Sequence, residues 1–555
     1  MDKRYINKQV MYNLNLSIQK YSLMKIFFKH ILSILLFLIL NLNSAVLAQN
    51  ESIEELIAGE IFDKTISAKE KHFYAVQLEN GMAITGKVIQ KGIDLVIDVY
   101  NPKGELSKQI DSPNGKDGDE QIDITANQSG IYKFVVHSLD KESKKGNYAL
   151  KVDQIISLSE NTKRITKREL PTETLYNLWE STLSNKNAID NFIAKQSERH
   201  IIEPIEGDND NMLVTYFCVP DHNTEYVMLS GGPDFLGLRF QRLPSTKLHF
   251  ITQRVPKDAR FNYGFNYFIL DKAGPNGEIE YRDVIHAYDG TVEMPNAPKQ
   301  RYIAERENVT KGTLLPTSIK SEFLGEERKI TVHTPANYDS TTPHNLLIVF
   351  DGESYGARPN RSSRIPTPTI IDNLTAENKI TPTVTILVWS MGKRSKDLVS
   401  EKFGDFIANE LVSWVRSEYN IHPNPDKVVL AGSSRGGFAS SFIAFRHSDV
   451  IGNVLSQSGS YWIKGTENEN HWIYPEENGK LINLYKQSKR LPIKFYMDIG
   501  LYDAGASMLG MNRQFRDILE LKGYEVDYHE FKGGHNYVNW RGTLSDGLIA
   551  LIGTE

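Results

Sequence analysis

The chain has 555 residues, of which 40% are hydrophobic and 24% charged, a composition that excludes wholesale disorder and a fibrous repeat. Lys and Arg total 64 against 69 Asp and Glu, and the net charge of −5 gives no broad electrostatic reason to bind nucleic acid. The single cysteine, Cys218, excludes an internal disulfide framework and any paired-cysteine zinc or redox site. At roughly 150 residues per domain, the length suggests three or four domains.

Residues 1–48 are expected to be a leader that contains a secretory signal. An apolar run over residues 31–40 follows two lysines and precedes the small-residue segment 45–48. This order of charged, apolar and small residues predicts a signal peptide cleaved after Ala48, with Met24 as a candidate true start. A membrane-spanning helix is the alternative, but it needs about 20 apolar residues. We therefore expect a periplasmic or secreted mature protein without a membrane span.

Residues 51–155 show the period-two alternation of β-strands. Apolar and polar residues alternate over 93–99 and 122–124, and turn-forming Gly, Asn and Pro residues separate such runs. This pattern predicts an antiparallel β-sandwich. The segments KHFYAVQLENG, IDLVIDVYNPKG, SGIYKFVVHS and GNYALKV resemble the bacterial pre-peptidase C-terminal domain, an accessory module of secreted enzymes. Its acidic residues are either a calcium or glycan site or the solvated turns of a spacer domain.

Residues 172–305 are expected to form a helix followed by a second β-rich domain. A polar stretch at 159–169 is interpreted as a linker, and apolar residues recur at helical spacing over 175–193. Cys218 is interpreted as a small core residue rather than a nucleophile. Strand-like apolar runs follow at 213–217, 226–229 and 261–265.

The pattern changes again in residues 310–555. Continuous apolar runs alternate here with amphipathic helical stretches such as 403–419. Runs of this kind suit central strands covered on both faces, and they predict a mostly parallel α/β sheet. The runs lie at 346–350, 384–388, 428–431, 450–455 and 493–497.

The motif with the clearest chemical meaning is Gly432-Ser433-Ser434-Arg435-Gly436. It follows the apolar run 428–431 and precedes a helix-like stretch, which is the setting of a nucleophile elbow. Ser434 holds the central position and is the predicted nucleophile, and Ser433 is the adjacent alternative. The expected fold is therefore multidomain, with an α/β-hydrolase catalytic domain at 310–555 preceded by two β-rich sandwich domains.

A serine nucleophile needs a base, and the base needs a group that orients it. In this fold the acid and the histidine follow the serine in that chain order. Asp503 lies just beyond the strand 493–497 and is the preferred acid, with Asp498 as its competitor closer to the strand. His535 lies in a Gly-rich loop after the last predicted strand, 525–531, and is the predicted base. His529 falls within that strand and is interpreted as a packed or surface residue.

Acyl transfer also needs hydrogen-bond donors for the oxyanion. The backbone N–H of Arg435, the residue after the nucleophile, is the first expected donor. The second is expected from Gly352 or Glu353, in the loop after the strand that ends at residue 350, and the sequence leaves the choice between them open. This mechanism requires no metal and no other cofactor.

Several segments resemble the enterochelin esterase family within the esterase D-like α/β-hydrolases. They are LLIVFDGE, IIDNLTAENKITPTV, VVLAGSSRGGFAS, NVLSQSGSYW and FKGGHNYVNWRG, in this order along residues 315–545. The upstream segments IIEPIEGDNDNMLVTYFCVP and QRLPSTKLHFITQRVPKDARFNYGF resemble the β-rich domain that precedes the hydrolase in these enzymes. Members hydrolyse ester bonds of catecholate siderophores such as enterobactin and free iron after uptake.

The resemblance implies Ser434, Asp503 and His535 as the catalytic residues and adds four candidates for substrate binding. Arginines and aromatic faces suit an anionic, iron-loaded catecholate through charge and cation–π contact. An arginine paired with a nearby carboxylate, or a tryptophan in the core, is the structural alternative for each. The four candidates are Arg394, Trp462, Trp540 and Arg541.

These observations predict an exported serine carboxylesterase whose partner is a small-molecule ester, such as a ferric catecholate siderophore. A feruloyl or acetyl esterase acting on polysaccharide is the alternative, because cytosolic enterochelin esterases lack both an export signal and the first sandwich. An inactive binding protein with a hydrolase fold is the alternative from another functional class.

Overall fold

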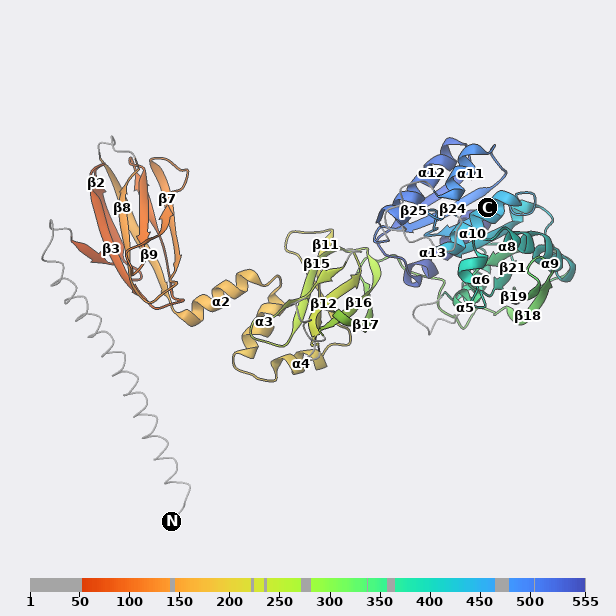
Figure 1. The fold of residues 1–555 in the computed structure, drawn as a ribbon, viewed down its shortest axis with the longest axis horizontal. Coiled ribbons are helices and arrows are strands. Elements are labelled where there is room, and N and C mark those ends of the chain that lie inside the picture. Colours follow the sequence, from red (N-terminus) through yellow and green to blue (C-terminus); the bar gives the residue numbers. More distant parts are fainter. Residues whose placement is uncertain are drawn as a thin grey trace, which may run out of the picture. The chain divides into compact units, whose positions relative to one another are not determined.

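A computed structural model describes residues 52–139, 145–220, 224–233, 237–270, 281–336, 338–356, 365–464, 479–503 and 505–554. The chain divides into two compact units, Met1–Glu169 and Leu170–Glu555, shown as ribbons in Figure 1. The predicted leader, residues 1–48, lies outside the described residues. None of the helices in the described ranges is long and apolar enough to cross a membrane.

The first unit contains the predicted β-sandwich, built from two sheets with the strand orders β1-β3-β8-β5-β6 and β2-β9-β4-β7. Alternate residues of the strands face inward, and Leu95, Ile97 and Val99 are fully buried in the core between the sheets. The strands are β1 Ile53–Glu55, β2 Ile61–Ile66, β3 Lys71–Leu78, β4 Ala83–Lys91, β5 Leu95–Tyr100, β6 Leu106–Ile110, β7 Asp117–Thr125, β8 Gly130–Ser138 and β9 Gly146–Ile156.

The stretch predicted as a linker is a helix, α2 (Leu158–Glu169), which the sequence analysis did not predict. Its polar composition gives no apolar stripe, but its side chains bond to the sandwich. Arg164 donates two hydrogen bonds to Asp123, each 2.9 Å long, and Asn161 donates to the Gly81 carbonyl at 2.9 Å. These contacts stabilise a helix that hydrophobic periodicity does not reveal.

The second unit begins with the helices α3 (Glu173–Thr182) and α4 (Ala188–Ala194), followed by a β-rich domain. Two four-stranded sheets, ordered β10-β11-β15-β14 and β13-β12-β16-β17, pack around Val214, Phe261 and Tyr263. Cys218 is buried in this core, as predicted. The strands are β10 His200–Pro204, β11 Asn211–Cys218, β12 Thr224–Gly231, β13 Leu238–Arg239, β14 Gln241–Arg242, β15 His249–Pro256, β16 Arg260–Leu270 and β17 Tyr281–Glu293.

The rest of the second unit is an α/β-hydrolase domain around an eight-stranded sheet, ordered β18-β19-β21-β20-β22-β23-β24-β25. All neighbours from β21 to β25 are parallel, and β18 and β19 are antiparallel. The strands are β18 Thr313–Ser321, β19 Glu326–Thr334, β20 Asn345–Val349, β21 Thr383–Val388, β22 Val428–Ser433, β23 Asn453–Gln457, β24 Lys494–Gly500 and β25 Glu525–Phe531.

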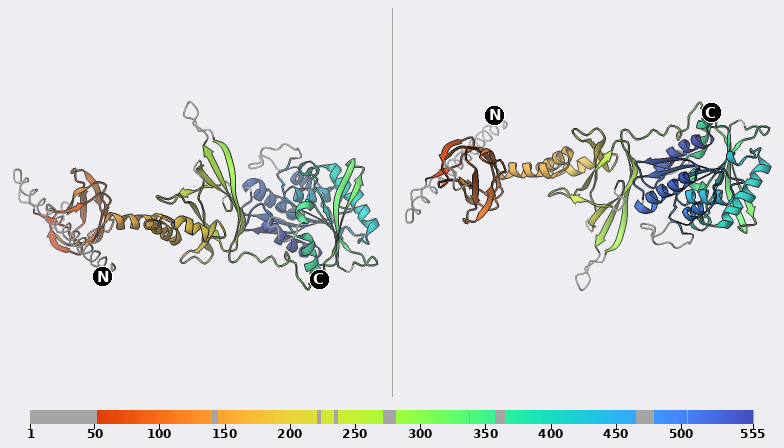
Figure 2. Two further views of the ribbon diagram at one scale, coloured as in Figure 1. Left: turned by 90° about the horizontal axis from the view of Figure 1, so that it is seen from below. Right: turned by 90° about the horizontal axis from the view of Figure 1, so that it is seen from above.

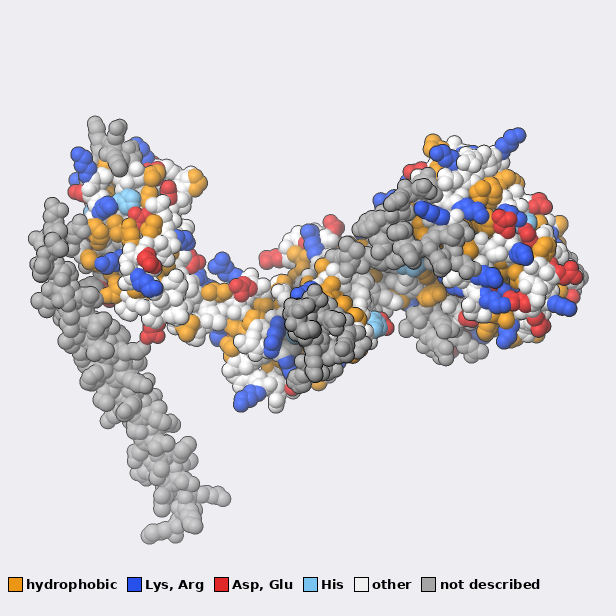
Figure 3. Space-filling view, viewed as in Figure 1, with side chains coloured by type: hydrophobic (Ala, Val, Ile, Leu, Met, Phe, Trp, Pro, Cys, Tyr) orange, Lys and Arg blue, Asp and Glu red, His pale blue; other side chains and the backbone are white. Residues whose placement is uncertain are grey.

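Helices cover both faces of this sheet, as Figure 2 shows. Separate buried clusters lie on the two faces, one including Phe438 and Phe515 and the other including Leu544 and Leu548. Basic and acidic side chains are interspersed on the face of the domain seen in Figure 3. The helices are α5 Gly352–Tyr355, α6 Thr367–Ala376, α7 Arg394–Asp397, α8 Glu401–Asp405, the π-helix η1 Phe406–Leu411, α9 Val412–Glu418, the 3₁₀-helix η2 Pro425–Lys427, α10 Arg435–Arg446, α11 Lys480–Gln487, the π-helix η3 Ala506–Gly510, α12 Met511–Leu521 and α13 Tyr537–Ile552.

Candidate active site

Ser434 occupies the sharp turn between β22 and α10. Its backbone has φ 59° and ψ −122°, a region that residues with a side chain rarely adopt. The amide of Ser434 donates to the Gln457 carbonyl at the end of β23, at 2.9 Å. A Cβ on Gly432 would lie 2.7 Å from the Gly436 backbone, so the turn closes only because Gly432 has no side chain. This is the geometry that raises a serine hydroxyl above the end of a sheet.

The hydroxyl of Ser434 lies beside a second serine that the sequence analysis did not single out. Ser434 Oγ and Ser460 Oγ are 3.3 Å apart, and the Ser460 amide donates to the Ser434 carbonyl at 3.0 Å. Among the described residues, no hydrogen bond joins Ser434 to His535. The signal that could have identified Ser460 is its place just after β23, the strand next to the one that carries the nucleophile.

Asp503 and His535 form a hydrogen bond. His535 Nδ1 and Asp503 Oδ2 are 2.9 Å apart, with the carboxylate side chain fully buried and the imidazole 34% exposed. The imidazole also packs edge-on against Trp540, with ring centroids 4.9 Å apart at 87°. A carboxylate at Nδ1 fixes the orientation of the ring and leaves Nε2 as the atom that can accept a proton.

The three residues follow parallel strands that end at the same edge of the sheet. Ser434 directly follows β22, Asp503 lies three residues after β24, and His535 lies four residues after β25. These strands are neighbours in the order β22-β23-β24-β25, and all run in the same direction. With this strand order, one edge of the sheet can carry a nucleophile at Ser434, a base at His535 and an orienting acid at Asp503.

Asp498, the alternative acid, lies inside β24 and is completely buried. Burial raises the pKa of its carboxyl to about 7, and the neighbouring Thr543 and Gln457 side chains offset part of that rise. Its side chain makes no hydrogen bond to His535 among the described residues. The structure therefore places Asp503, and not Asp498, against the imidazole.

The raised pKa of Asp498 predicts how stability depends on pH. The folded state holds this proton up to about pH 7, whereas an unfolded chain releases it near pH 4. The contribution of Asp498 to the free energy of unfolding is therefore fully present below about pH 4. Between about pH 4 and pH 7 this contribution falls by up to about 1.4 kcal/mol per pH unit, and above pH 7 it falls no further. In urea unfolding between pH 5 and pH 8, we expect Asp498→Asn to remove this loss. An unchanged pH slope in the variant would contradict the assignment.

The predicted oxyanion donors open two helices. Arg435 is the first residue of α10, and Gly352 and Glu353 are the first two of α5. Amides in the first turn of a helix point out of its N-terminal end and have no acceptor within the helix. The Glu353 side chain accepts hydrogen bonds from the amides of Ser390 and Met391, both 3.1 Å long. This fixes the position of the loop that carries the second donor.

Arg394, predicted to bind substrate, is engaged within the protein. Its Nε lies 2.8 and 2.9 Å from the two carboxylate oxygens of Asp351, and one terminal nitrogen donates to the Ser433 carbonyl at 3.2 Å. Asp351 is buried, has φ 56° and precedes α5. Arg394 therefore links the loop of Gly352 and Glu353 to the turn of Ser434.

The other predicted substrate residues lie in different surroundings. Trp540 is 3% exposed and donates from Nε1 to Ser458 Oγ at 3.1 Å. Trp462 is half-buried, and the guanidinium carbon of Arg435 lies 5.7 Å from its ring centroid. Arg541 Nε donates to Gln300 Oε1 of the β-rich region at 2.7 Å, and burial lowers the pKa of this guanidinium. Of these three, only Trp540 contacts the histidine ring.

Comparison with known proteins finds esterases that are similar to the second unit. Residues 321–551 match the family described as "Putative esterase". The iron(III) enterobactin esterase of Dickeya dadantii is 26% identical over 274 residues, which cover 47% of this chain and 60% of that protein. The iron(III) salmochelin esterase of Escherichia coli O6:H1 is 23% identical over 394 residues, 64% of this chain and 90% of that protein. This chain thus spans less than two thirds of the Dickeya protein.

The fold has a counterpart among solved structures. The crystal structure of ferric enterobactin esterase from Salmonella typhimurium superposes with a TM-score of 0.53 at 20% sequence identity. The match covers 65% of this chain and 98% of that one, a larger share than the hydrolase domain alone. The second unit therefore has an enterochelin esterase-like α/β-hydrolase fold preceded by a β-rich domain.

Proposed function

We propose that this chain is an exported serine esterase that hydrolyses ester bonds of a catecholate siderophore of the enterobactin type. The observation that carries the chemistry is the 2.9 Å hydrogen bond between His535 and buried Asp503, at the sheet edge where Ser434 follows β22. An imidazole oriented by a carboxylate is the proton acceptor that a serine hydroxyl needs to act as a nucleophile.

In the proposed reaction, Ser434 Oγ attacks the carbonyl carbon of the ester while His535 Nε2 takes its proton. The amide of Arg435 and that of Gly352 or Glu353 donate hydrogen bonds to the oxyanion. The bond to the alkoxy group then breaks, and the alcohol leaves with the proton from His535. A water molecule, deprotonated by His535, attacks the acyl-enzyme, releases the carboxylic acid and restores Ser434.

The substrate class is supported by the relatives, which are named for enterobactin and salmochelin. It is also supported by the extent of the structural likeness, which reaches beyond the hydrolase domain. In this proposal the iron is cargo of the substrate, and hydrolysis contributes to its release. Export rests on the signal-like order of charged, apolar and small residues within residues 1–48.

Parallel incubations with ferric enterobactin and with feruloylated xylan test the substrate class. Mass spectrometry is expected to show hydrolysed siderophore fragments in the first reaction and no free ferulate in the second. Ferulate as the only product would replace the proposal with a polysaccharide esterase. No product in either reaction, together with no labelling by a fluorophosphonate probe, would indicate an inactive binding protein.

A further inference from the structure

The loop that carries His535 packs against the β-rich domain. The contact is made by residues 258–261, which include the first two residues of β16 and are called the junction segment here. The amide of Arg260 donates to the Lys532 carbonyl at 2.9 Å, and Asn539 Nδ2 donates to the Arg260 carbonyl at 2.8 Å. Backbone groups of the junction segment thus bond to residues on both sides of His535 in the chain.

The side chain of Arg260 holds the junction segment in place. Arg260 is 4% exposed, and one terminal nitrogen donates to Glu293 Oε1 and to the Pro298 carbonyl, each at 2.8 Å. A buried guanidinium with these partners fixes the backbone on which the histidine loop rests. At the surface, Lys532 Nζ lies 2.8 and 2.9 Å from the carboxylate oxygens of Asp258.

Gly533 shows how closely the two parts approach. A Cβ on Gly533 would lie 2.5 Å from the Arg260 carbonyl oxygen and 2.1 Å from Asn539 Nδ2, so no side chain fits there. The carbonyl of Gly533 accepts a hydrogen bond from the Tyr502 amide at 2.9 Å. Gly533 therefore contacts both the junction segment and the residue that precedes Asp503.

The junction segment also contacts the acid side of the pair. Phe261 packs edge-on against the ring of Tyr502, with centroids 5.6 Å apart at 78°. Because Tyr502 adjoins Asp503 and Gly533 lies two residues before His535, the segment contacts the chain next to both members of the hydrogen-bonded pair.

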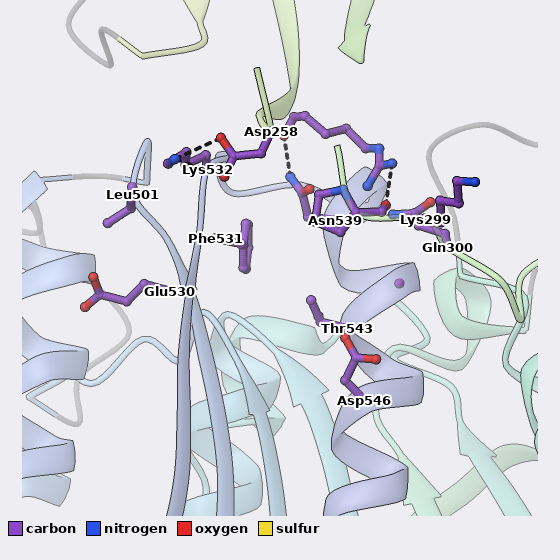
Figure 4. A pocket seen from close by; sticks show the side chains of 13 residues that line it. Asp258, Lys299, Gln300, Leu501, Glu530, Phe531, Lys532, Asn539, Thr543 and Asp546 are labelled. Carbon is purple, nitrogen blue, oxygen red and sulfur yellow. Dashed lines mark hydrogen bonds and ion pairs between the residues drawn. The ribbon is translucent and has the colours of Figure 1, made fainter. Parts of the chain in front are cut away.

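A cavity lies next to the contact between the junction segment and the histidine loop. Figure 4 shows a cavity between β25 and α13, below the Asp258–Lys532 pair and the Asn539 side chain. Its volume is about 210 Å³, and Phe531 and Thr543 are among its lining residues. Asp258 and Arg260 of the junction segment also line this cavity, together with Lys532 and Asn539.

We infer that the junction segment of the β-rich domain is a positioning element for the Asp503–His535 pair. The inference deepens the proposed function and rests on it, because it concerns the same pair. The β-rich domain acts here through Gly533 and Tyr502, without touching the reacting atoms.

Gly533→Ala tests this role, because the added methyl group must displace either the Arg260 backbone or the histidine loop. In the full chain, we expect the downfield Nδ1 proton of His535, assigned by its loss in His535→Gln, to weaken or vanish in the NMR spectrum. We expect kcat for p-nitrophenyl acetate to fall by about 10²-fold, with KM within about threefold of wild type. Gly510→Ala is the control, because nothing lies within 4 Å of its added methyl group, and both measurements should stay unchanged.

Asp258→Asn is the second variant, for the case in which Gly533→Ala does not fold. It weakens the exposed ion pair between Asp258 and Lys532, so we expect the His535 proton signal to fall less than in Gly533→Ala. We expect kcat to fall two- to fivefold, which is about the effect of removing one exposed ion pair. Asp258→Glu keeps the negative charge and should restore both quantities. If Gly533→Ala folds and keeps the wild-type proton signal, the inference is overturned. If Gly533→Ala does not fold, a wild-type proton signal in Asp258→Asn overturns it. The Nδ1 proton signal reports on the Asp503–His535 hydrogen bond even if the protein has no esterase activity. A wild-type protein that shows the signal but no activity would contradict the proposed function and leave the inference open to the same NMR test.

Discussion

Ser434→Ala is expected to lower kcat for p-nitrophenyl acetate by at least about 10⁴-fold, because the acyl-enzyme can no longer form. The substitution removes only a hydroxyl group whose contact with Ser460 is 3.3 Å long, so the loss of stability should be small. Steady-state kinetics give the first quantity, and thermal unfolding, with a midpoint within about 2 °C of wild type, checks the second. The variant should also fail to react with a fluorophosphonate probe.

Ser433→Ala is the matched control, because Ser433 adjoins Ser434 and was the alternative nucleophile in the motif. Its side chain is buried at the end of β22, and we expect the variant to keep both activity and labelling. Full labelling of Ser434→Ala, or loss of labelling in Ser433→Ala alone, would transfer the nucleophile to Ser433.

The elements of the candidate active site were predictable where their signal is local. The strand predicted at 525–531 is β25, Glu525–Phe531, with identical bounds, because the sequence alternates along it and breaks at Lys532. The turn at Ser434 follows from a motif of five residues between a buried strand and a helix. Strand order then brings Asp503 and His535 to the same edge, since parallel neighbours share their direction.

Features that depend on pairing between distant residues were not predictable. Helix α2 looks like a linker because its partner, Asp123, lies 41 residues before Arg164. Pairing with a carboxylate was one of the two alternatives for Arg394, but its partner, Asp351, could not be identified because it lies 43 residues away in another loop. The contact of Gly533 with Arg260 joins two domains, and no periodicity in either segment indicates it.

Asp503→Asn is expected to lower kcat by about 10³- to 10⁴-fold with little change in KM. The carboxylate accepts the Nδ1 proton of His535 at 2.9 Å, and an amide that turns its NH₂ group toward the ring stabilises the wrong tautomer. The side chain is fully buried, so no water can replace the lost acceptor at that position. Because the substitution keeps the shape of the side chain, the variant should fold, and kcat at pH 6 measures the loss directly.

Asp498→Asn is the control that makes this result specific, since both substitutions replace a buried carboxyl on or near β24 by an amide. With its pKa raised to about 7 by burial, Asp498 carries a proton in most molecules at pH 6, and an amide of the same shape resembles that neutral form. We therefore expect Asp498→Asn to change kcat less than about tenfold at the same pH. A larger loss in Asp498→Asn than in Asp503→Asn would make Asp498 the acid, because only the residue that orients the imidazole can control the tautomer of the base.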